Sequence, residues 1–220
     1  MIPLPRSRRF TLLAGLAALG AVLFVPFLQA SAPGQLSTGF AVAFVGVATG
    51  VAALATWFGL AWADGAGLPM PLLRAFETRT AAPRMGRPIG WAVRGGAAFG
   101  IAGIAALRIA HIPGGSGSLP VKIGSALFAA VTLESVLHLA IMSGVVRATG
   151  RIWAGIAAAT VAFILFHLST LGGQPASVVA LATIANGLGG LLFGLLYARH
   201  GFESLVVAHL IAHAITVGFA

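Results

Sequence analysis

The chain has 220 residues, of which 59% are hydrophobic and 8% are charged, and its mean hydropathy is +1.01. A soluble domain of this length cannot bury so much apolar surface, so the composition excludes a soluble enzyme and indicates a membrane protein with several spans. The net charge of +9 does not indicate a nucleic-acid partner, because the basic residues fall in short loops between apolar segments. The absence of cysteine excludes disulfides, thiolate metal sites and cysteine-protease chemistry.

Seven stretches are long and apolar enough to cross a bilayer, whose hydrocarbon core of about 30 Å requires about 20 helical residues. They are residues 10–28, 40–63, 89–110, 123–146, 152–172, 176–198 and 202–219. The intervening segments are rich in Gly, Pro and Ser, which is typical of loops. The sequence therefore predicts an all-α, polytopic transmembrane helix bundle that forms a single integral membrane domain over residues 1–220.

The basic residues are distributed asymmetrically over the predicted loops. In a seven-helix arrangement, ten of them fall on one side of the membrane: Arg6, Arg8, Arg9, Arg74, Arg79, Arg84, Arg87, Arg147, Arg151 and Arg199. Arg108 and Lys122 fall on the other side, and Arg94 lies just inside the third segment, near the ten. Because positively charged loops remain in the cytoplasm, the sequence predicts a cytoplasmic N-terminus and a C-terminus on the opposite side.

Two segments allow more than one interpretation. Residues 6–32 combine a basic start with an apolar run that ends in small residues, which is also typical of a secretory signal peptide. The length of the run and the proline after the nominal cleavage site favour a retained helix. The stretch 68–79 is short and has apolar and basic faces, so we expect a helix along the cytoplasmic interface or an ordinary loop helix. Glu203 follows Arg199 and His200, and we expect an ion pair there.

Glu134 is the one acidic residue placed deep in an apolar segment; the other three acids of the chain lie in or beside polar loops. An ionisable group in the middle of a bilayer costs roughly 2.5–3.5 kcal/mol on insertion scales, so such a residue is a functional candidate. Its candidate partners are histidines in the same and neighbouring segments.

The histidines occupy positions that bring them to similar depth. His138 follows Glu134 by four residues, so the two share one helix face. His209 and His213 share a face of the seventh segment, and His167 lies in the outer part of the fifth. Since successive helices alternate in direction, all these groups fall in the middle-to-outer part of the bilayer and can meet in one cavity. A lone membrane histidine can also serve only as a hydrogen bond between helices.

Two chemistries would use a buried glutamate with several histidines. In the first, the desolvated carboxylate of Glu134 is a stronger base and removes a proton from water, while imidazoles orient that water and stabilise the oxyanion of an attacked amide. In the second, a zinc ion activates the water; its ligands would be Glu134, His167, His209 and His213. Because a catalytic zinc needs an open position, one of the four would have to remain off the metal. We favour the first route, without a cofactor.

The last hundred residues resemble the CAAX protease and bacteriocin-processing family of intramembrane peptidases. That family has three helical motifs, EExxxR, FxxxH and HxxxN. The second is intact here from Phe163 to His167, and the third begins at His209. The run GLLYARHGFESLVVAHLIAH, which leads through a turn into the histidine helix, is the most specific part of the resemblance.

This sequence departs from the family pattern in the first and third motifs. If Glu134 matches the first glutamate, Ser135 replaces the second and Leu139 replaces the arginine. If it matches the second glutamate, Leu133 replaces the first and His138 replaces the arginine. The former alignment keeps the carboxylate in the base role and is preferred. His213 stands where the third motif has asparagine.

The resemblance implies that Glu134 activates water with His167, and that His209 and His213 hold the oxyanion. His138, Phe163, Ser135 and Asn186 would support the site; Asn186 either lines the cavity or bonds a neighbouring helix. Residues 10–110 would then supply three N-terminal helices, and 123–219 the four helices of the catalytic core.

The expected function is an intramembrane endopeptidase in the bacterial inner membrane. Its partners would be lipid and a membrane-associated protein or peptide that is lipidated, leader-bearing or anchored at its C-terminus. The altered motifs leave open a catalytically impaired immunity or scaffold protein of the same family. A proton-coupled or metal-ion carrier would also use a Glu–His chain, although carriers usually show repeated halves.

Overall fold

A computed structural model describes residues 7–31, 37–109, 118–169 and 171–219, and the regular elements of this part of the chain are all helical. In chain order they are α1 (Ser7–Ser31), α2 (Thr38–Ala66), α3 (Pro71–Thr78), α4 (Gly86–Ile109), α5 (Leu119–Leu127), η1 (Phe128–Leu133), η2 (Ser135–Met142), α6 (Ser143–Thr149), α7 (Ile152–Leu168), α8 (Ala176–His200) and α9 (Phe202–Phe219). The prediction of an all-α bundle is confirmed.

Within the described ranges, five helical segments are long and apolar enough to cross a membrane. They are Arg8–Gln29, Thr38–Ala66, Gly86–Ile109, Leu119–Thr149 and Ala176–His200; Ile152–Leu168 and Phe202–Thr216 are shorter apolar helices. Large apolar side chains project outward from several of these helices: Val42, Leu54, Ile101 and Ile184 are each more than 60% exposed. An outer surface of this kind fits a lipid environment, so the structure is consistent with an integral membrane protein.

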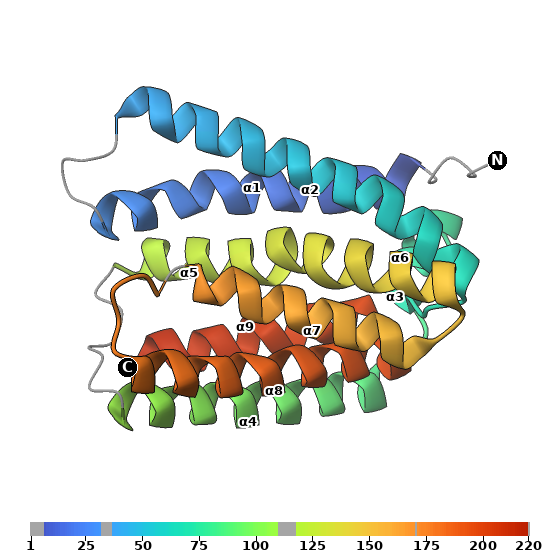
Figure 1. Cartoon of the computed structure of the whole chain (residues 1–220). Coiled ribbons are helices and arrows are strands. Elements are labelled where there is room, and N and C mark those ends of the chain that lie inside the picture. Colours follow the sequence, from blue (N-terminus) through green and yellow to red (C-terminus); the bar gives the residue numbers. More distant parts are fainter. Residues whose placement is uncertain (1–6, 32–36, 110–117, 170, 220) are drawn as a thin grey trace.

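The long helices run side by side along one axis (Figure 1). The chain from α5 to α6 lies in the centre, with α1 and α2 packed on one side of it and with α7 and α9 on the other. Helix α4 packs against α9 and α8 at the outside of this second group. The start of α1 and the end of α9 lie at opposite ends of the bundle.

Glycines on α4 let α9 approach closely. A Cβ atom added at Gly100 would lie 2.9 Å from the carbonyl oxygen of Ala212, and one at Gly96 would overlap that of Ala208. Backbone contact of this kind is how small residues join membrane helices. Ala208 and Ala212 precede His209 and His213 directly, so these two glycines set the distance of the histidine helix from its neighbour.

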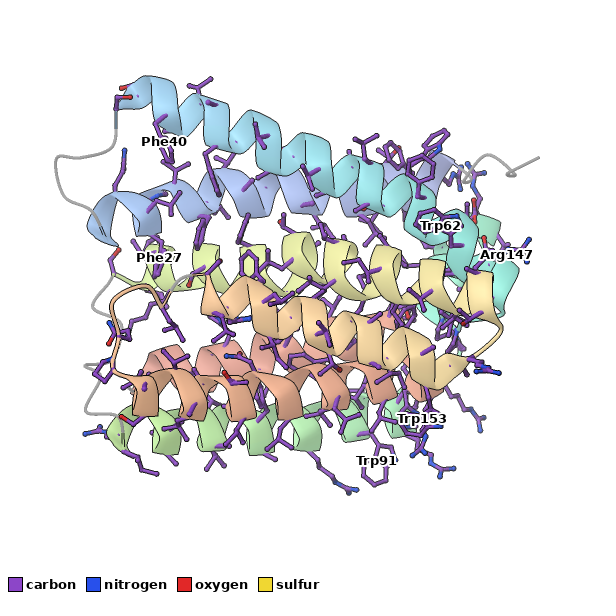
Figure 2. All side chains as sticks on the ribbon, viewed as in Figure 1. Phe27, Phe40, Trp62, Trp91, Arg147 and Trp153 are labelled. Atoms are coloured by element: carbon purple, nitrogen blue, oxygen red, sulfur yellow. The ribbon has the colours of Figure 1, made fainter. Side chains whose placement is uncertain are left out.

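One end of the bundle carries the aromatic and basic side chains expected at a membrane interface. Figure 2 shows Trp62, Trp91 and Trp153 at the same end as Arg147, whereas Phe27 and Phe40 lie at the opposite end. Tryptophan is enriched where hydrocarbon meets headgroups, because its ring is apolar and its N–H is polar.

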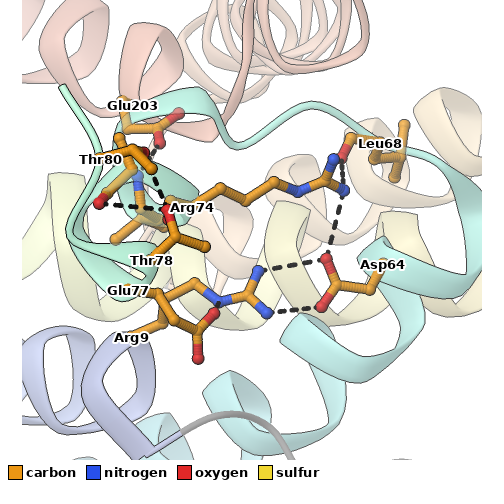
Figure 3. Close-up of polar contacts among 10 residues, drawn as sticks. Arg9, Asp64, Leu68, Arg74, Glu77, Thr78, Thr80 and Glu203 are labelled. Atoms are coloured by element: carbon orange, nitrogen blue, oxygen red, sulfur yellow. Dashed lines mark hydrogen bonds and ion pairs between the residues drawn. The ribbon is translucent and has the colours of Figure 1, made fainter. Parts of the chain in front are cut away.

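Three of the four acidic residues lie at this end (Figure 3), and two of them, Asp64 and Glu77, form a polar cluster with arginines. Arg9 is buried and donates two hydrogen bonds to Asp64, at 3.1 and 2.6 Å. Its Nε lies 2.6 Å from Glu77, and Arg74 Nη2 lies 3.2 Å from Asp64. The cluster ties α1, the end of α2 and the short helix α3 together.

Helix α3 lies within the predicted amphipathic stretch and is held to α9 by Glu203. The Glu203 carboxylate accepts a hydrogen bond of 2.7 Å from the backbone N–H of Leu73, in the first turn of α3. The expected ion pair of Glu203 with Arg199 or His200 is not formed among the described residues. An unsatisfied N–H at a helix start is a favourable partner for a carboxylate, which explains the difference.

The packing of α4 on α9 leads to a stability prediction. Gly96→Ala should destabilise the protein by about 1–3 kcal/mol, because its methyl group would collide with backbone rather than with a movable side chain. Gly90→Ala on the same helix is the matched control, since nothing lies within 4 Å of its added Cβ. The control should gain up to about 1 kcal/mol from helix propensity. Thermal unfolding of the detergent-solubilised variants measures both changes; equal shifts for the two variants would contradict the close approach.

Candidate functional site

The candidate site is built around a change of helix type in the centre of the bundle. Between α5 and α6 the chain winds as a π-helix, through η1 and η2, and Glu134 lies at the junction of these two segments. π-Helical turns in membrane and soluble helices occur frequently at functional sites. Helix α2 packs closely on this segment, because a Cβ at Gly59 would lie only 2.7 Å from the carbonyl oxygen of Leu139.

Glu134 is completely buried, and each of its carboxylate oxygens is held by a different imidazole. Oε1 lies 2.5 Å from Nδ1 of His209, and Oε2 is hydrogen-bonded to Nδ1 of His138. The structure therefore brings together the acid and two of the predicted histidines, from two different helices. A charged carboxylate away from water is stable only with such partners.

The contacts of His138 determine which of its ring nitrogens carry protons. Its Nε2 lies 3.3 Å from the carbonyl oxygen of Gly190 on α8. A carbonyl only accepts hydrogen bonds, so Nε2 carries a proton. One further proton then lies between Nδ1 and Glu134, either on the imidazole or on the carboxyl group. In both cases the Glu134–His138 pair is neutral overall, which suits its buried position.

Two neighbouring aromatic rings pack against His209. The ring of Phe193 stacks on it with centroids 4.8 Å apart and an interplanar angle of 22°. Phe163 lies 6.0 Å from His209, 4.4 Å from His167 and 6.4 Å from His138, so it occupies the centre of the three imidazoles. These rings restrict the rotation of His209 and keep its Nδ1 directed at Glu134.

A cavity of about 300 Å³ adjoins this cluster. Its walls include five of the predicted site residues, namely Phe163, His167, Asn186, His209 and His213. It also reaches Leu107 near the end of α4 and Val178 near the start of α8. The cavity therefore lies in the half of the bundle away from the end that carries Trp62 and Arg147.

Glu134 is placed behind this cavity rather than in its wall. It is 0% exposed and is not among the residues that line the cavity, whereas His209 both lines the cavity and contacts Glu134. Because Nδ1 of His209 faces Glu134, Nε2 on the opposite edge of the ring is the nitrogen that can face the cavity. Glu134 can thus act on a molecule in the cavity through His209.

The remaining cavity groups have defined hydrogen bonds. Nδ1 of His167 donates to the carbonyl oxygen of Phe163 at 2.8 Å, because a carbonyl oxygen only accepts hydrogen bonds. Nε2 of His213 lies 3.1 Å from Ser125 Oγ, which itself donates to the carbonyl of Lys122. His213 therefore donates to Ser125, and its Nδ1 is the acceptor.

Asn186 lines the cavity and bonds within its own helix. Its Nδ2 donates to the carbonyl oxygen of Ala182 at 2.9 Å. An amide nitrogen has two hydrogens, so a second donor remains for a group in the cavity. Of the two roles that the sequence left open for Asn186, the position in the cavity wall is the one observed.

Ser135 is the one predicted supporting residue that does not join the cluster. It is completely buried, its Oγ has no hydrogen-bond partner within the described part of the chain, and it does not line the cavity. Sequence reasoning also missed three contributors: the ring of Phe193, the carbonyl of Gly190 and the hydroxyl of Ser125. The Gly189–Gly190 pair was a usable signal for a close approach of α8, but no pattern indicates which ring stacks on His209.

No protein-family model, curated protein or solved structure matches the chain. The resemblance to the CAAX protease and bacteriocin-processing family therefore depends on the motif residues alone.

Proposed function

We propose that the protein is an intramembrane endopeptidase that hydrolyses a peptide bond of a membrane-associated protein, and that it belongs to the family it resembles. The observation that carries the proposal is the buried Glu134 carboxylate bound to Nδ1 of His209, with the ring of His209 in the wall of a cavity. This is the arrangement by which a carboxylate orients a histidine as a general base.

The proposed reaction begins with a water molecule in the cavity beside His209. As the water oxygen forms a bond to the amide carbon, Nε2 of His209 accepts the proton that the water loses. Glu134 holds the required tautomer and stabilises the imidazolium that forms. Because it does not line the cavity, we propose it as a positioning residue and not as the base that the sequence suggested. When the C–N bond breaks, the imidazolium returns this proton to the departing amine nitrogen.

The other polar groups of the cavity have separate roles. His167 and His213 both line it, which suits them to orient the attacking water. Asn186 has a donor left for the oxyanion that develops on the attacked carbonyl. The resemblance implies that the histidines stabilise the oxyanion. In the proposed reaction they do so only when one of them is protonated.

The proposed topology has seven spans, the five long helices together with α7 and α9, and a cytoplasmic N-terminus. Arg147 and three tryptophans gather at the end where α1 starts, which supports placing that end at the cytoplasmic interface. The cavity would then lie in the outer half of a bacterial inner membrane. We propose that substrate reaches it from that side.

We propose that the reaction does not use a zinc ion bound by Glu134, His167, His209 and His213. Both oxygens of Glu134 are engaged by imidazole nitrogens. Within the described ranges, no group of three or more His, Asp or Glu side chains is arranged to hold a metal ion. The proposed steps therefore use water and the side chains alone.

The first test is the substitution Glu134→Gln. The glutamine cannot stabilise an imidazolium, so cleavage should fall by about 10²–10⁴-fold, the usual contribution of acid–base catalysis. The assay uses proteoliposomes with internally quenched peptides, each with an apolar segment and a short polar tail. Glu203→Gln is the matched control, because a glutamine oxygen still accepts the hydrogen bond from Leu73, and it should retain activity. Retained cleavage by Glu134→Gln would contradict the proposal.

A second test concerns metal. Protein purified without chelator should contain far less than one zinc per chain, and excess EDTA should leave the cleavage rate unchanged. His209→Ala should remove activity without changing the metal content. Stoichiometric zinc in the wild type that is lost in His209→Ala would overturn the proposed scheme.

One observation favours a second candidate function, a proton-coupled carrier. Polar groups form a row from His138 and Glu134 through His209 to His213 and Ser125, which leads from the middle of the bundle toward its outer end. Such rows can move protons. Proton flux through proteoliposomes that cleave none of the peptides would favour the carrier over the peptidase.

A further inference from the structure

A second polar site lies on the outer surface at the basic end, away from the cavity. Arg87, Trp91 and Arg94 follow one another at four- and three-residue intervals on α4, so they share one face of that helix. All three are exposed. Figure 2 shows Trp91 projecting outward from α4, at the same end of the bundle as Trp153 and Arg147.

The end of α8 completes this site. The ring of His200 stacks on Trp91, with centroids 6.3 Å apart and an interplanar angle of 12°. The guanidinium of Arg94 lies 5.7 Å from the centre of the Trp91 ring. Arg87 and Arg199 both lie close enough to His200 to interact with it electrostatically. Three arginines thus lie close to the stacked pair of Trp91 and His200.

These arginines have no anionic partner in the part of the chain that the structure describes. Asp64 and Glu77 are bound by Arg9 and Arg74, Glu203 accepts from Leu73, and Glu134 is deep in the bundle. None of the ion pairs among the described residues involves Arg87, Arg94 or Arg199. All four acids of the chain are therefore accounted for elsewhere.

The depth of Arg94 makes a missing anion costly. It lies seven residues beyond Arg87, which is roughly 10 Å further along the helix, in a segment long and apolar enough to cross a membrane. A guanidinium facing lipid at that depth must reach a polar group, and in a bilayer the phosphates of the headgroups are the nearest ones. Arginine binds phosphate with paired hydrogen bonds.

The same face of α4 continues as an apolar surface away from the basic end. Ala98 and Ile101 follow Arg94 at four- and three-residue intervals and are exposed, Ile101 by 62%. A small residue followed by a large apolar one leaves room for an acyl chain below the headgroup. A free phosphate ion would make no use of this apolar surface or of Trp91.

We infer that the surface formed by Arg87, Trp91, Arg94 and Arg199 binds the phosphodiester headgroup of an anionic phospholipid. The lipid neutralises Arg94 and lies along α4, beside the helix pair that positions His209. This inference does not depend on the proposed peptidase activity, because it concerns a different face and a different ligand.

The test compares Arg94→Gln with Arg84→Gln by native mass spectrometry of the full chain in detergent. Each variant loses one positive charge, but Arg84 lies in the loop before α4, outside the site. Phosphatidylglycerol should bind Arg94→Gln about fivefold more weakly than the wild type, as expected for one basic residue near a membrane surface. Arg84→Gln should match the wild type, and phosphatidylcholine should bind all three proteins equally weakly. Arg199→Gln is the second site variant and should resemble Arg94→Gln.

Three results would overturn the inference. Equal losses in Arg94→Gln and Arg84→Gln would mean that only diffuse charge attracts the lipid. Unchanged phosphatidylglycerol binding in both Arg94→Gln and Arg199→Gln would mean that the site does not exist. Displacement of the lipid by inorganic phosphate at similar concentration would mean that the ligand is a free anion. Matching thermal unfolding of Arg94→Gln and wild type, measured without phosphatidylglycerol, excludes misfolding as the cause of a loss.

Discussion

The completely buried carboxylate of Glu134, held between two imidazoles, determines how the centre of this bundle is arranged. Glu134 receives His138 from its own helix and His209 from α9. Each of these two histidines has a separate role. His138 shares a proton with the acid and so keeps the buried pair neutral. His209 both contacts the acid and lines the cavity, so it connects the two.

Close packing of the helices holds the residues of this contact in place. Gly96 and Gly100 let α9 approach α4, and Gly59 lets α2 approach the π-helical segment that holds Glu134. At the basic end, the cluster around Arg9 and the bond from Leu73 to Glu203 anchor α3 against α1, α2 and α9. The three remaining acids are thus used for anchoring at one end, which leaves Glu134 as the acid beside the cavity.

Much of this could be predicted from the sequence, because apolar length and ionisable residues in apolar segments are strong signals. Spacing alone placed Glu134 and His138 on one face, and the depths of His167, His209 and His213 indicated a common cavity. The sequence could not show that Glu134 lies behind His209, because this depends on the rotation of α9 and on the π-helical winding of residues 128–142. It also could not identify Phe193 or the carbonyl of Gly190, since these contacts arise only when separate helices pack. Glu203 was assigned to its sequence neighbours, but the first turn of α3, 130 residues earlier in the chain, supplies its hydrogen-bond donor.

The most direct test of the central contact is the proton position on His209, measured by nitrogen-15 NMR of the imidazole side chains in lipid. The signal is assigned by its loss in His209→Gln. We predict a neutral ring with the proton on Nδ1, facing Glu134, and with a lone pair on Nε2. A ring that carries its proton on Nε2 instead would rule out this contact, because His209 could then neither donate to Glu134 nor accept a proton from water in the cavity.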